Sequence, residues 1–428
     1  GRAIKQYNVT GNLSHRNLIK SFVMIKRSAA VANMKTKAIN RKQGTAIVRA
    51  CDKILAGKYI DQFVVDMINS GAGTAFNMNS NEVITNVALK GLGKKQGQYQ
   101  FLHPNDHVNM SQSSNDTYPT AMHMAILFSF GEMLPAIDKL IKSINKKAKQ
   151  FSKYKKLGRT HLMDALPVTL GSEFAAYATS LTNARNQIIS SQKELEQVAL
   201  GGTAVGTGAN TPRGYRKIAI IELSKVSKLS LKPQKDMQYA LQSKFPVANA
   251  SSALKNFAIE LGKVANDIRL MASGPIAGLA ELGIPAVHAG SSIMPGKINP
   301  SLAECMNMIC FSVIGNDTTV SFAAQAGQFE LNVMLPGMLK AVLDSTDMLT
   351  NFLPIFSANL IEGLTANQIR LRENIENSPV IVTLLTPKIG YLKSADLFKE
   401  SLKTGKTIRE LVISKKLMTD KEVNVLLG

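Results

Sequence analysis

Long stretches with helical apolar periodicity are the feature that most limits how this chain can fold. Apolar residues recur at helical spacing over residues 17–35, 45–55, 170–200, 246–274, 300–315 and 318–354. Strand patterns are sparse along the whole sequence. A long helix cannot bury its apolar face alone, so it must pack against other helices. The sequence therefore predicts a mainly α protein built around a bundle of long helices.

A glycine-bracketed loop at residues 290–300, with the sequence GSSIMPGKINP, precedes one of these helical patterns. We expect Asn299 to cap a helix that starts at Pro300, which places the positive dipole end of that helix beside Lys297. Such a loop presents a positive region to an anion. It is not a P-loop, because five residues rather than four separate its glycines and Ile298 stands where Ser or Thr should follow the lysine. By its pattern alone it is either a catalytic segment or an ordinary surface turn.

Further polar blocks occur in order along the chain. Thr74 lies at a predicted helix start, and Asp116 or Thr117 is the predicted cap of a long helix with Pro119 in its first turn. Capping accounts for one or two of the polar residues at 111–116, but hardly for four in succession. The blocks lie at residues 71–82, 111–116, 158–161 and 327–332.

Together with the loop at 290–300, these blocks resemble the signature of the aspartase/fumarase superfamily, whose members eliminate fumarate from succinyl compounds. The resemblance covers essentially the whole chain. It implies a mainly α, three-domain fold whose central domain of five long helices forms a twenty-helix core in a homotetramer, with active sites shared by three subunits. The expected domains are an N-terminal helical domain at 1–110, the central bundle at 111–363 and a small C-terminal helical domain at 364–428.

The resemblance also implies which residues carry the reaction. Ser291 matches the catalytic base, whose oxyanion must be stabilised by nearby N–H groups and positive charge. His161 is implied to bind and polarise the substrate, with Glu304 as the acidic residue that orients it. Lys297 is implied to hold a carboxylate end of the substrate. The remaining substrate-binding positions implied in this way are Thr74, Ser113, Ser114, Asn115, Thr160, Ser292 and Asn299.

Aspartate is the expected substrate, which would make the protein a lyase that reversibly eliminates ammonia to give fumarate through an aci-carboxylate intermediate. Ala72 stands where the similar fumarases usually have Ser, and the chain lacks the tryptophan that they carry shortly before that turn. Residues 61–66, 105–109 and 313–320 also look like aspartase.

Two alternatives stay open at this point. Residues 119–123 and 201–208 look like fumarase, which favours a class II fumarate hydratase acting on L-malate. Ile276 stands where both branches usually have Arg, and losing a guanidinium there would suit a non-catalytic relative. The short N-terminus and the high charge favour the same third hypothesis.

The formal charge of +21, from 51 basic and 30 acidic residues, raises the question of a nucleic-acid partner. The basic residues are scattered, and neither aromatic interleaving nor a recognised nucleic-acid-binding fold accompanies them. We therefore expect no specific nucleic-acid binding. A basic surface of this kind attracts a small dicarboxylate substrate instead.

From the remaining composition we expect a cytoplasmic protein without a membrane span. No apolar run reaches about 18 residues, the first residues lack an apolar signal core, and the three cysteines suggest neither a disulfide framework nor a metal site. The implied elimination needs no cofactor. The sequence shows no carboxylate cluster for magnesium and leaves activation by a divalent cation open.

Overall fold

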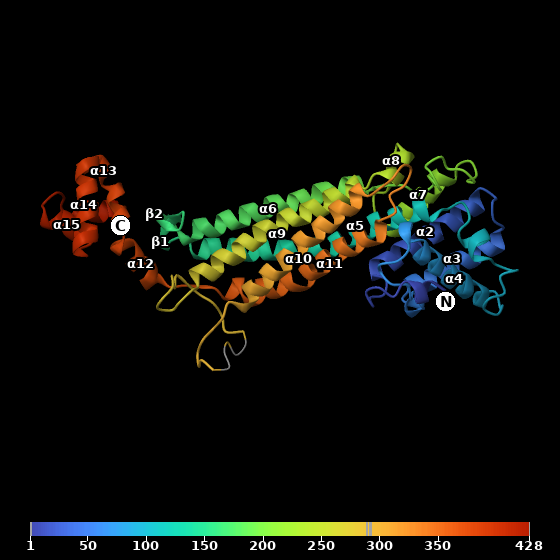
Figure 1. Cartoon of the computed structure of the whole chain (residues 1–428), viewed down its shortest axis with the longest axis horizontal. Coiled ribbons are helices and arrows are strands. Elements are labelled where there is room, and N and C mark those ends of the chain that lie inside the picture. Colours follow the sequence, from blue (N-terminus) through green and yellow to red (C-terminus); the bar gives the residue numbers. More distant parts are fainter. Residues whose placement is uncertain (1, 288–289, 291–292, 428) are drawn as a thin grey trace. The chain divides into compact units, whose positions relative to one another are not determined.

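The computed structural model describes residues 2–287, 290 and 293–427, and it confirms the mainly α fold (Figure 1). Contacts divide the chain into two compact units whose segments alternate along the sequence. Unit 1 comprises Gly1–Pro135, Ala184–Ile259 and Ile309–Asn351. Unit 2 comprises Ala136–Asn183, Glu260–Met308 and Phe352–Gly428. The three-domain division inferred from the sequence stays a prediction.

The long helices predicted from periodicity are present, and each contributes a section to both units. Within each unit these sections run alongside one another (Figure 1). In unit 1, Asp317 accepts hydrogen bonds from Ser251 and Lys255, and in unit 2 the Tyr177 hydroxyl donates to Asp267 at 2.8 Å. None of the described helices is apolar enough over a sufficient length to cross a membrane. The long helices are α5 (Ser114–Gln150), α6 (Leu170–Leu195), α9 (Phe245–Met271), α10 (Ser301–Gln325) and α11 (Leu335–Asn359).

The predicted helix over 318–354 is wrong, because the chain turns between α10 and α11. The side-chain amide of Asn332 donates to the carbonyls of Ala323 and Ala324 at 2.9 and 3.0 Å, which satisfies two carbonyls at the end of α10. The backbone N–H of Asn332 donates to Leu241 O at 3.1 Å. Apolar residues continue on both sides of this turn, so periodicity alone does not reveal it.

Unit 1 also holds the two N-terminal helices that the sequence predicted. The Phe22 ring lies edge-on to those of Phe76 and Tyr118, with centroids 4.9 and 5.6 Å apart, and all three side chains are fully buried. The helices and strands of this unit, besides the long helices, are α1 (Arg2–Gln6), α2 (Arg16–Lys35), α3 (Arg41–Leu55), η1 (Ile60–Gln62), η2 (Gly71–Gly73), α4 (Thr74–Gly91), the π-helical turn η3 (Pro104–Val108), β3 (Gln197–Val198), α7 (Tyr215–Ser227), β4 (Lys232–Pro233) and α8 (Met237–Gln242).

Unit 2 contains an antiparallel hairpin that the sequence did not predict. Its first strand is held by Glu281, which is fully buried and pairs with Arg159 at 2.7 Å and Lys156 at 3.3 Å. Burial opposes ionisation, but the bond from Arg159 and the charge of Lys156 hold the pKa of Glu281 below its usual value. The remaining elements are β1 (Lys155–Thr160), β2 (Met163–Thr169), β5 (Leu282–Gly283), η4 (Ile361–Gly363), β6 (Thr365–Ala366), α12 (Gln368–Asn377), η5 (Pro379–Leu384), α13 (Thr386–Ile389), α14 (Tyr391–Thr404), α15 (Ile408–Ser414) and α16 (Asp420–Leu427).

The stability of unit 1 is expected to fall with pH below about 6.5, because His123 cannot easily be protonated in the fold. Its Nδ1 lies 3.1 Å from the carbonyls of Leu195 and Gln197, and burial, reinforced by the charge of Lys244, lowers the pKa of His123 to about 4. Between pH about 6.5 and 4 only the unfolded chain takes up this proton. The stabilisation that neutral His123 gives is therefore complete above the pKa of this histidine in the unfolded chain. It is lost as pH falls, at up to about 1.4 kcal/mol of unfolding free energy per pH unit.

The variant His123→Gln keeps an amide donor for the two carbonyls and removes the titration. We expect its unfolding free energy, measured by urea denaturation, to depend less steeply on pH than that of the wild type between pH about 6 and 4.5. Above that window the two profiles should run parallel. Identical slopes throughout the window would show that His123 is not the group responsible.

Candidate functional site

The first turn of α5 gathers several of the predicted substrate-binding residues. Ser113 is the N-cap, because its carbonyl accepts from Thr117 N at 3.0 Å and its Oγ accepts from Asn115 N at 3.2 Å. Asp116, at the third helical position, accepts from the Ser113 N–H at 3.0 Å. The predicted cap at Asp116 or Thr117 is wrong by three or four residues, and Pro119 lies in the second turn. Ser114 and Asn115 are therefore the first two residues of α5, and both are half-buried.

Thr74 and Ser114, forty residues apart, are brought together at this helix start. Their hydroxyl oxygens lie 3.1 Å apart, and Thr74 also donates to Gly71 O at 3.3 Å. Thr74 is the first residue of α4, as the sequence predicted, and Gly73 before it has φ 63°. A Cβ at Gly73 would lie 1.8 Å from the Tyr118 ring, so only glycine fits there. The turn thus fixes the Thr74 hydroxyl beside that of Ser114.

The glycine-rich segment at 201–208 is fastened to the same helix start. The amide Nδ2 of Asn115 donates to Ala204 O at 2.9 Å. The Oδ2 atom of Asp116 accepts from the N–H groups of Gly201 and Thr203, each at 2.9 Å. Asp116 is fully buried, and burial raises its pKa to about 6 although these N–H bonds oppose the shift. Sequence reasoning treated Asp116 only as a cap and missed this anchoring role.

A buried lysine lies close to this group and was also missed. The ammonium of Lys26 donates to the Oδ1 atoms of Asn77 at 2.7 Å and Asn109 at 2.9 Å, and Asn81 Nδ2 donates to the same Asn109 oxygen at 3.2 Å. Burial lowers the pKa of Lys26 to about 7, while the charge of Asp116 raises it. Lys26 stands at a position where the apolar periodicity of α2 predicts a buried residue. That is the sequence signal that could have identified it.

In unit 2, the hairpin presents Thr160 and His161. Thr160 pairs with Met163 across the turn, and both central residues, His161 and Leu162, have positive φ, at 57° and 61°. Two positive φ values characterise the type I′ turn that suits a tight hairpin, and they are unusual for residues other than glycine, asparagine and aspartate. Both predicted site residues are exposed at the tip of the hairpin. Arg159, directly before Thr160, pairs with Glu281 and holds that tip in place.

The loop at 290–300 is described only in part. Ser291 and Ser292, predicted as base and binding residue, lie outside the described residues. The side-chain amide of Asn299 donates to Gly290 O at 2.6 Å, and a Cβ at Gly290 would lie 1.8 Å from Lys297 O. Only glycine permits this close approach between the two arms of the loop. Lys297 itself is exposed.

The predicted cap of α10 is displaced by one residue. The helix begins at Ser301, and the carbonyl of Pro300 accepts from Ala303 N and Glu304 N, each at 3.0 Å. Pro300 therefore occupies the N-cap position predicted for Asn299, whose side chain instead ties the loop to Gly290. The start of α10 still lies next to Lys297 in the chain, as the sequence predicted.

Glu304 is in the first turn of α10 and contacts a different residue from the predicted one. Its Oε1 lies 3.9 Å from Arg269 Nη2, and both side chains are partly exposed. Among the described residues of one chain, no ion pair joins Glu304 to His161. The orientation of His161 by Glu304 therefore stays a prediction, which the homotetramer implied by the resemblance would satisfy only across subunits.

The predicted residues thus fall into two groups. Unit 1 brings together Thr74, Ser113, Ser114 and Asn115, whereas Thr160, His161, Lys297, Asn299 and Glu304 belong to unit 2. The described residues contain no group of three or more His, Cys, Asp or Glu side chains that could hold a metal ion. Hydroxyls, amides and a lysine are the chemistry that binds and stabilises carboxylates.

Comparisons with known proteins identify the family of this chain. The family described as "Lyase" matches residues 3–315, and the family "Fumarase C C-terminus" matches residues 381–428. The aspartate ammonia-lyase of a Bacillus species is 43% identical over 427 residues, covering 100% of this chain and 91% of the relative. The aspartate ammonia-lyase of Escherichia coli K12 is 41% identical over 426 residues, covering 99% of this chain and 89% of the relative.

Solved structures are similar over the full chain. The fumarate lyase:delta crystallin from Brucella melitensis bound to cobalt has a TM-score of 0.97 and 40% identity, with 100% of this chain and 93% of that chain covered. The class II fumarase from Schistosoma mansoni has a TM-score of 0.96 and 34% identity with the same coverage. Matches of this length and identity establish descent as well as fold. The chain belongs to the aspartase/fumarase superfamily of lyases.

Proposed function

We propose that the protein reversibly eliminates ammonia from L-aspartate to give fumarate. The observation that carries this proposal is that relatives named aspartate ammonia-lyase, from Bacillus, Helicobacter pylori and Escherichia coli, are 41–43% identical over 99–100% of the chain. Ala72, where the similar fumarases usually have Ser, supports the same substrate. It is buried in the turn before α4, and its N–H donates to Val333 O at 2.8 Å.

The proposed reaction starts with Ser291 as the base. It takes the C3 proton of aspartate, and the electron pair moves into the adjacent carboxylate to form a dianionic aci-carboxylate. The pair then returns to form the C2–C3 double bond as the C2–N bond breaks and ammonia leaves. Because negative charge grows on one carboxylate, donors must be placed there in advance.

Lys297 and Asn299 are proposed to meet that growing charge. Lys297 is exposed on a loop whose arms are tied together through Gly290, so its ammonium is available to a ligand. At about 4 Å and an effective dielectric constant of about 20, one lysine–carboxylate contact contributes on the order of 4 kcal/mol before desolvation. That local contribution outweighs the diffuse attraction of the basic surface.

The unit 1 group is proposed to bind the other carboxylate and the leaving group. The paired hydroxyls of Thr74 and Ser114 supply donors and acceptors, and the cap residue Ser113 lies beside them. The Asn115 amide nitrogen donates to Ala204 O. This bond orients Asn115 Oδ1 as an acceptor for an ammonium group. Thr160 and His161 are proposed to bind and polarise the substrate from the hairpin tip.

The site is proposed to be completed in a homotetramer, with three subunits contributing to each active site. The absence of a His161–Glu304 pair among the described residues of one chain supports this assembly. The reaction as proposed uses no cofactor. Activation by a divalent cation stays a separate hypothesis, and a cytoplasmic location stays an expectation.

A class II fumarate hydratase is the second candidate. It is favoured by the similarity to the Schistosoma mansoni class II fumarase and by the fumarase-like segments at 119–123 and 201–208. A non-catalytic relative is the third, favoured by Ile276, which is 87% exposed where an arginine is usual. The three candidate functions differ in whether the protein converts L-aspartate, L-malate or neither compound.

The deciding experiment follows fumarate absorbance after the protein is given L-aspartate or L-malate separately. We expect turnover of aspartate to exceed that of malate by at least about 10²-fold, because a site that hydrogen-bonds one leaving group is poorly matched to another. The Ser291→Ala variant, purified in the same way, controls for contaminating host enzymes. Faster turnover of malate would establish the hydratase instead, and no turnover of either compound would favour the non-catalytic relative.

A further inference from the structure

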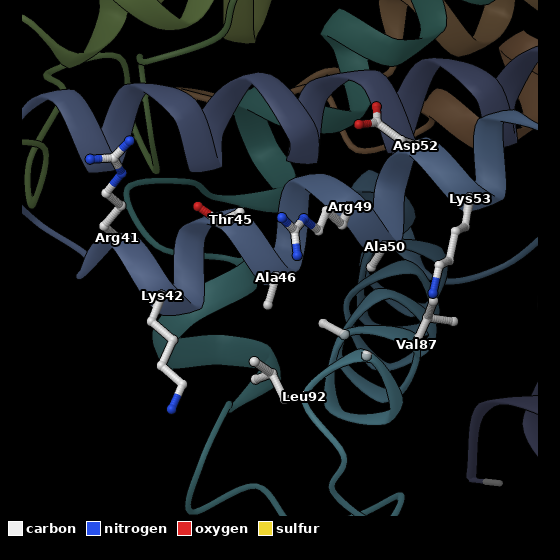
Figure 2. Close-up of a pocket in the computed structure, with 12 residues that line it drawn as sticks. Arg41, Lys42, Thr45, Ala46, Arg49, Ala50, Asp52, Lys53, Val87 and Leu92 are labelled. Atoms are coloured by element: carbon white, nitrogen blue, oxygen red, sulfur yellow. The ribbon is translucent and has the colours of Figure 1, made fainter.

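A cavity of about 770 Å³ opens in unit 1 between α3 and the C-terminal end of α4, and none of the predicted active-site residues lines it (Figure 2). Its volume lies within the range of small-molecule sites. The lining divides by chemistry into an apolar floor and a basic rim. The floor consists of Ala46, Ala50, Val87, Ala88 and Leu92, and the rim of Arg41, Lys42, Arg49 and Lys53.

The rim is strongly and unusually positive. Within the described lining the single carboxylate is that of Asp52, and its Oδ1 already accepts from Arg27 Nε at 2.7 Å. The basic side chains of the rim form no ion pair with any described residue and are exposed. Their charge is therefore available to a ligand. Repulsion among them is relieved when an anion binds.

The start of α3 adds to this charge. Arg41 and Lys42 occupy its first turn, which contains no acidic residue. Cations at the positive end of a helix dipole are unfavourable, and the usual preference is for Asp or Glu. Figure 2 shows the side chains of Lys42, Arg49 and Lys53 extending from α3 beside the floor, whereas that of Arg41 extends away from it. An anion at this rim would turn an unfavourable arrangement into a favourable one.

The number of cations on one face of α3 favours an anion with several negative charges. Lys42, Arg49 and Lys53 are seven and four residues apart, so they share one face of α3 and extend over about 16 Å of helix. A four-carbon dicarboxylate carries two negative charges, whereas a chain of phosphates carries more and can meet more of these cations at once. Guanidinium groups also bind phosphate oxygens in pairs. The apolar floor next to the rim suits an aromatic base.

We propose that this cavity binds a nucleoside polyphosphate, with the base against Ala46 and Leu92 and the phosphates along Lys42 and Arg49. The site is separate from the proposed catalytic residues. It does not depend on which succinyl compound the protein converts.

The test is calorimetric titration of the intact protein with ATP at about 0.15 M salt, where weak surface attraction is screened. We expect saturable binding that the double variant Lys42→Gln/Arg49→Gln weakens by about 10- to 10²-fold. The matched control is Lys58→Gln/Lys217→Gln, which removes the same charge from exposed positions outside the cavity and should leave the affinity within about twofold. Thermal unfolding of each variant checks that the fold is retained.

Inorganic triphosphate, adenosine and fumarate complete the experiment. Triphosphate should bind more weakly than ATP, and adenosine more weakly still, because each lacks one half of the ligand. The proposal fails if ATP does not saturate, if the control variant loses as much affinity as the cavity variant, or if triphosphate alone binds as tightly as ATP. Displacement of ATP by fumarate would place the binding in the active site and would also overturn it.

Discussion

Replacing Ser291 with alanine is expected to lower kcat by about 10²–10⁴-fold, the usual contribution of a positioned base. The proposed elimination has no other group assigned to take the C3 proton of aspartate, whereas the carboxylate contacts come from Lys297, Asn299 and the α5 start. The affinity for fumarate should therefore change little. Initial rates of fumarate formation measure the loss in kcat, and calorimetry with fumarate measures binding.

Measuring fumarate binding distinguishes a variant that has lost only the base from one whose whole site is damaged. A variant that neither binds fumarate nor turns over would indicate a damaged site, and Ser291→Ala with more than about a tenth of wild-type kcat would rule out the serine as base. Coexpression with Asn115→Ala tests the assembly as well. If Ser291 and Asn115 act in one site from different subunits, mixed tetramers of the two variants contain some intact sites and should turn over faster than either variant alone.

The helical part of the fold could be predicted because each long helix carries its own apolar periodicity. The turn between α10 and α11 could not, because it is held by Asn332, whose partners Ala323, Ala324 and Leu241 are set by the packed structure. The predicted patterns at 17–35 and 45–55 correspond to α2 and α3, and for α3 only the start differs.

The hairpin at 155–169 was missed for a different reason. Its strands contain few β-branched or aromatic residues, and a buried lysine, Lys156, breaks the expected alternation. That lysine is tolerated because it pairs with Glu173 at 2.8 Å and with Glu281, 125 positions later, at 3.3 Å. A local pattern cannot contain this information.

The candidate site was found through the identity and order of its polar blocks, whereas its geometry was not predictable. Nothing local indicates that the hydroxyls of Thr74 and Ser114 lie 3.1 Å apart. Nor does the sequence distinguish a capping carboxylate from one that anchors a distant segment. Asp116 accepts from the cap residue Ser113 as well as from Gly201 and Thr203, and for that reason its loss should strongly destabilise the fold.

Replacing Asp116 with alanine is expected to lower the free energy of unfolding by about 3–6 kcal/mol. The carboxylate is fully buried and accepts from the N–H groups of Ser113, Gly201 and Thr203, so its removal leaves buried donors unpaired at about 1–3 kcal/mol each. Lys26 also loses the negative charge that offsets the cost of burying its ammonium group. Urea unfolding followed by circular dichroism, at fixed protein concentration and above the pKa of Asp116, measures the change.

The conservative variant Asp116→Asn distinguishes the acceptor role from simple packing. Asparagine fills the same volume but places an NH₂ donor against N–H donors on one side, so it should recover only part of the lost stability. Asp396→Ala, an exposed acid on α14, is the matched control and should stay within about 0.5 kcal/mol of the wild type. A loss below about 1 kcal/mol for Asp116→Ala would mean that solvent or a shifted backbone satisfies these donors. In that case Asp116 would not be what fastens the 201–208 segment to α5, and Asn115 would keep its orientation without it.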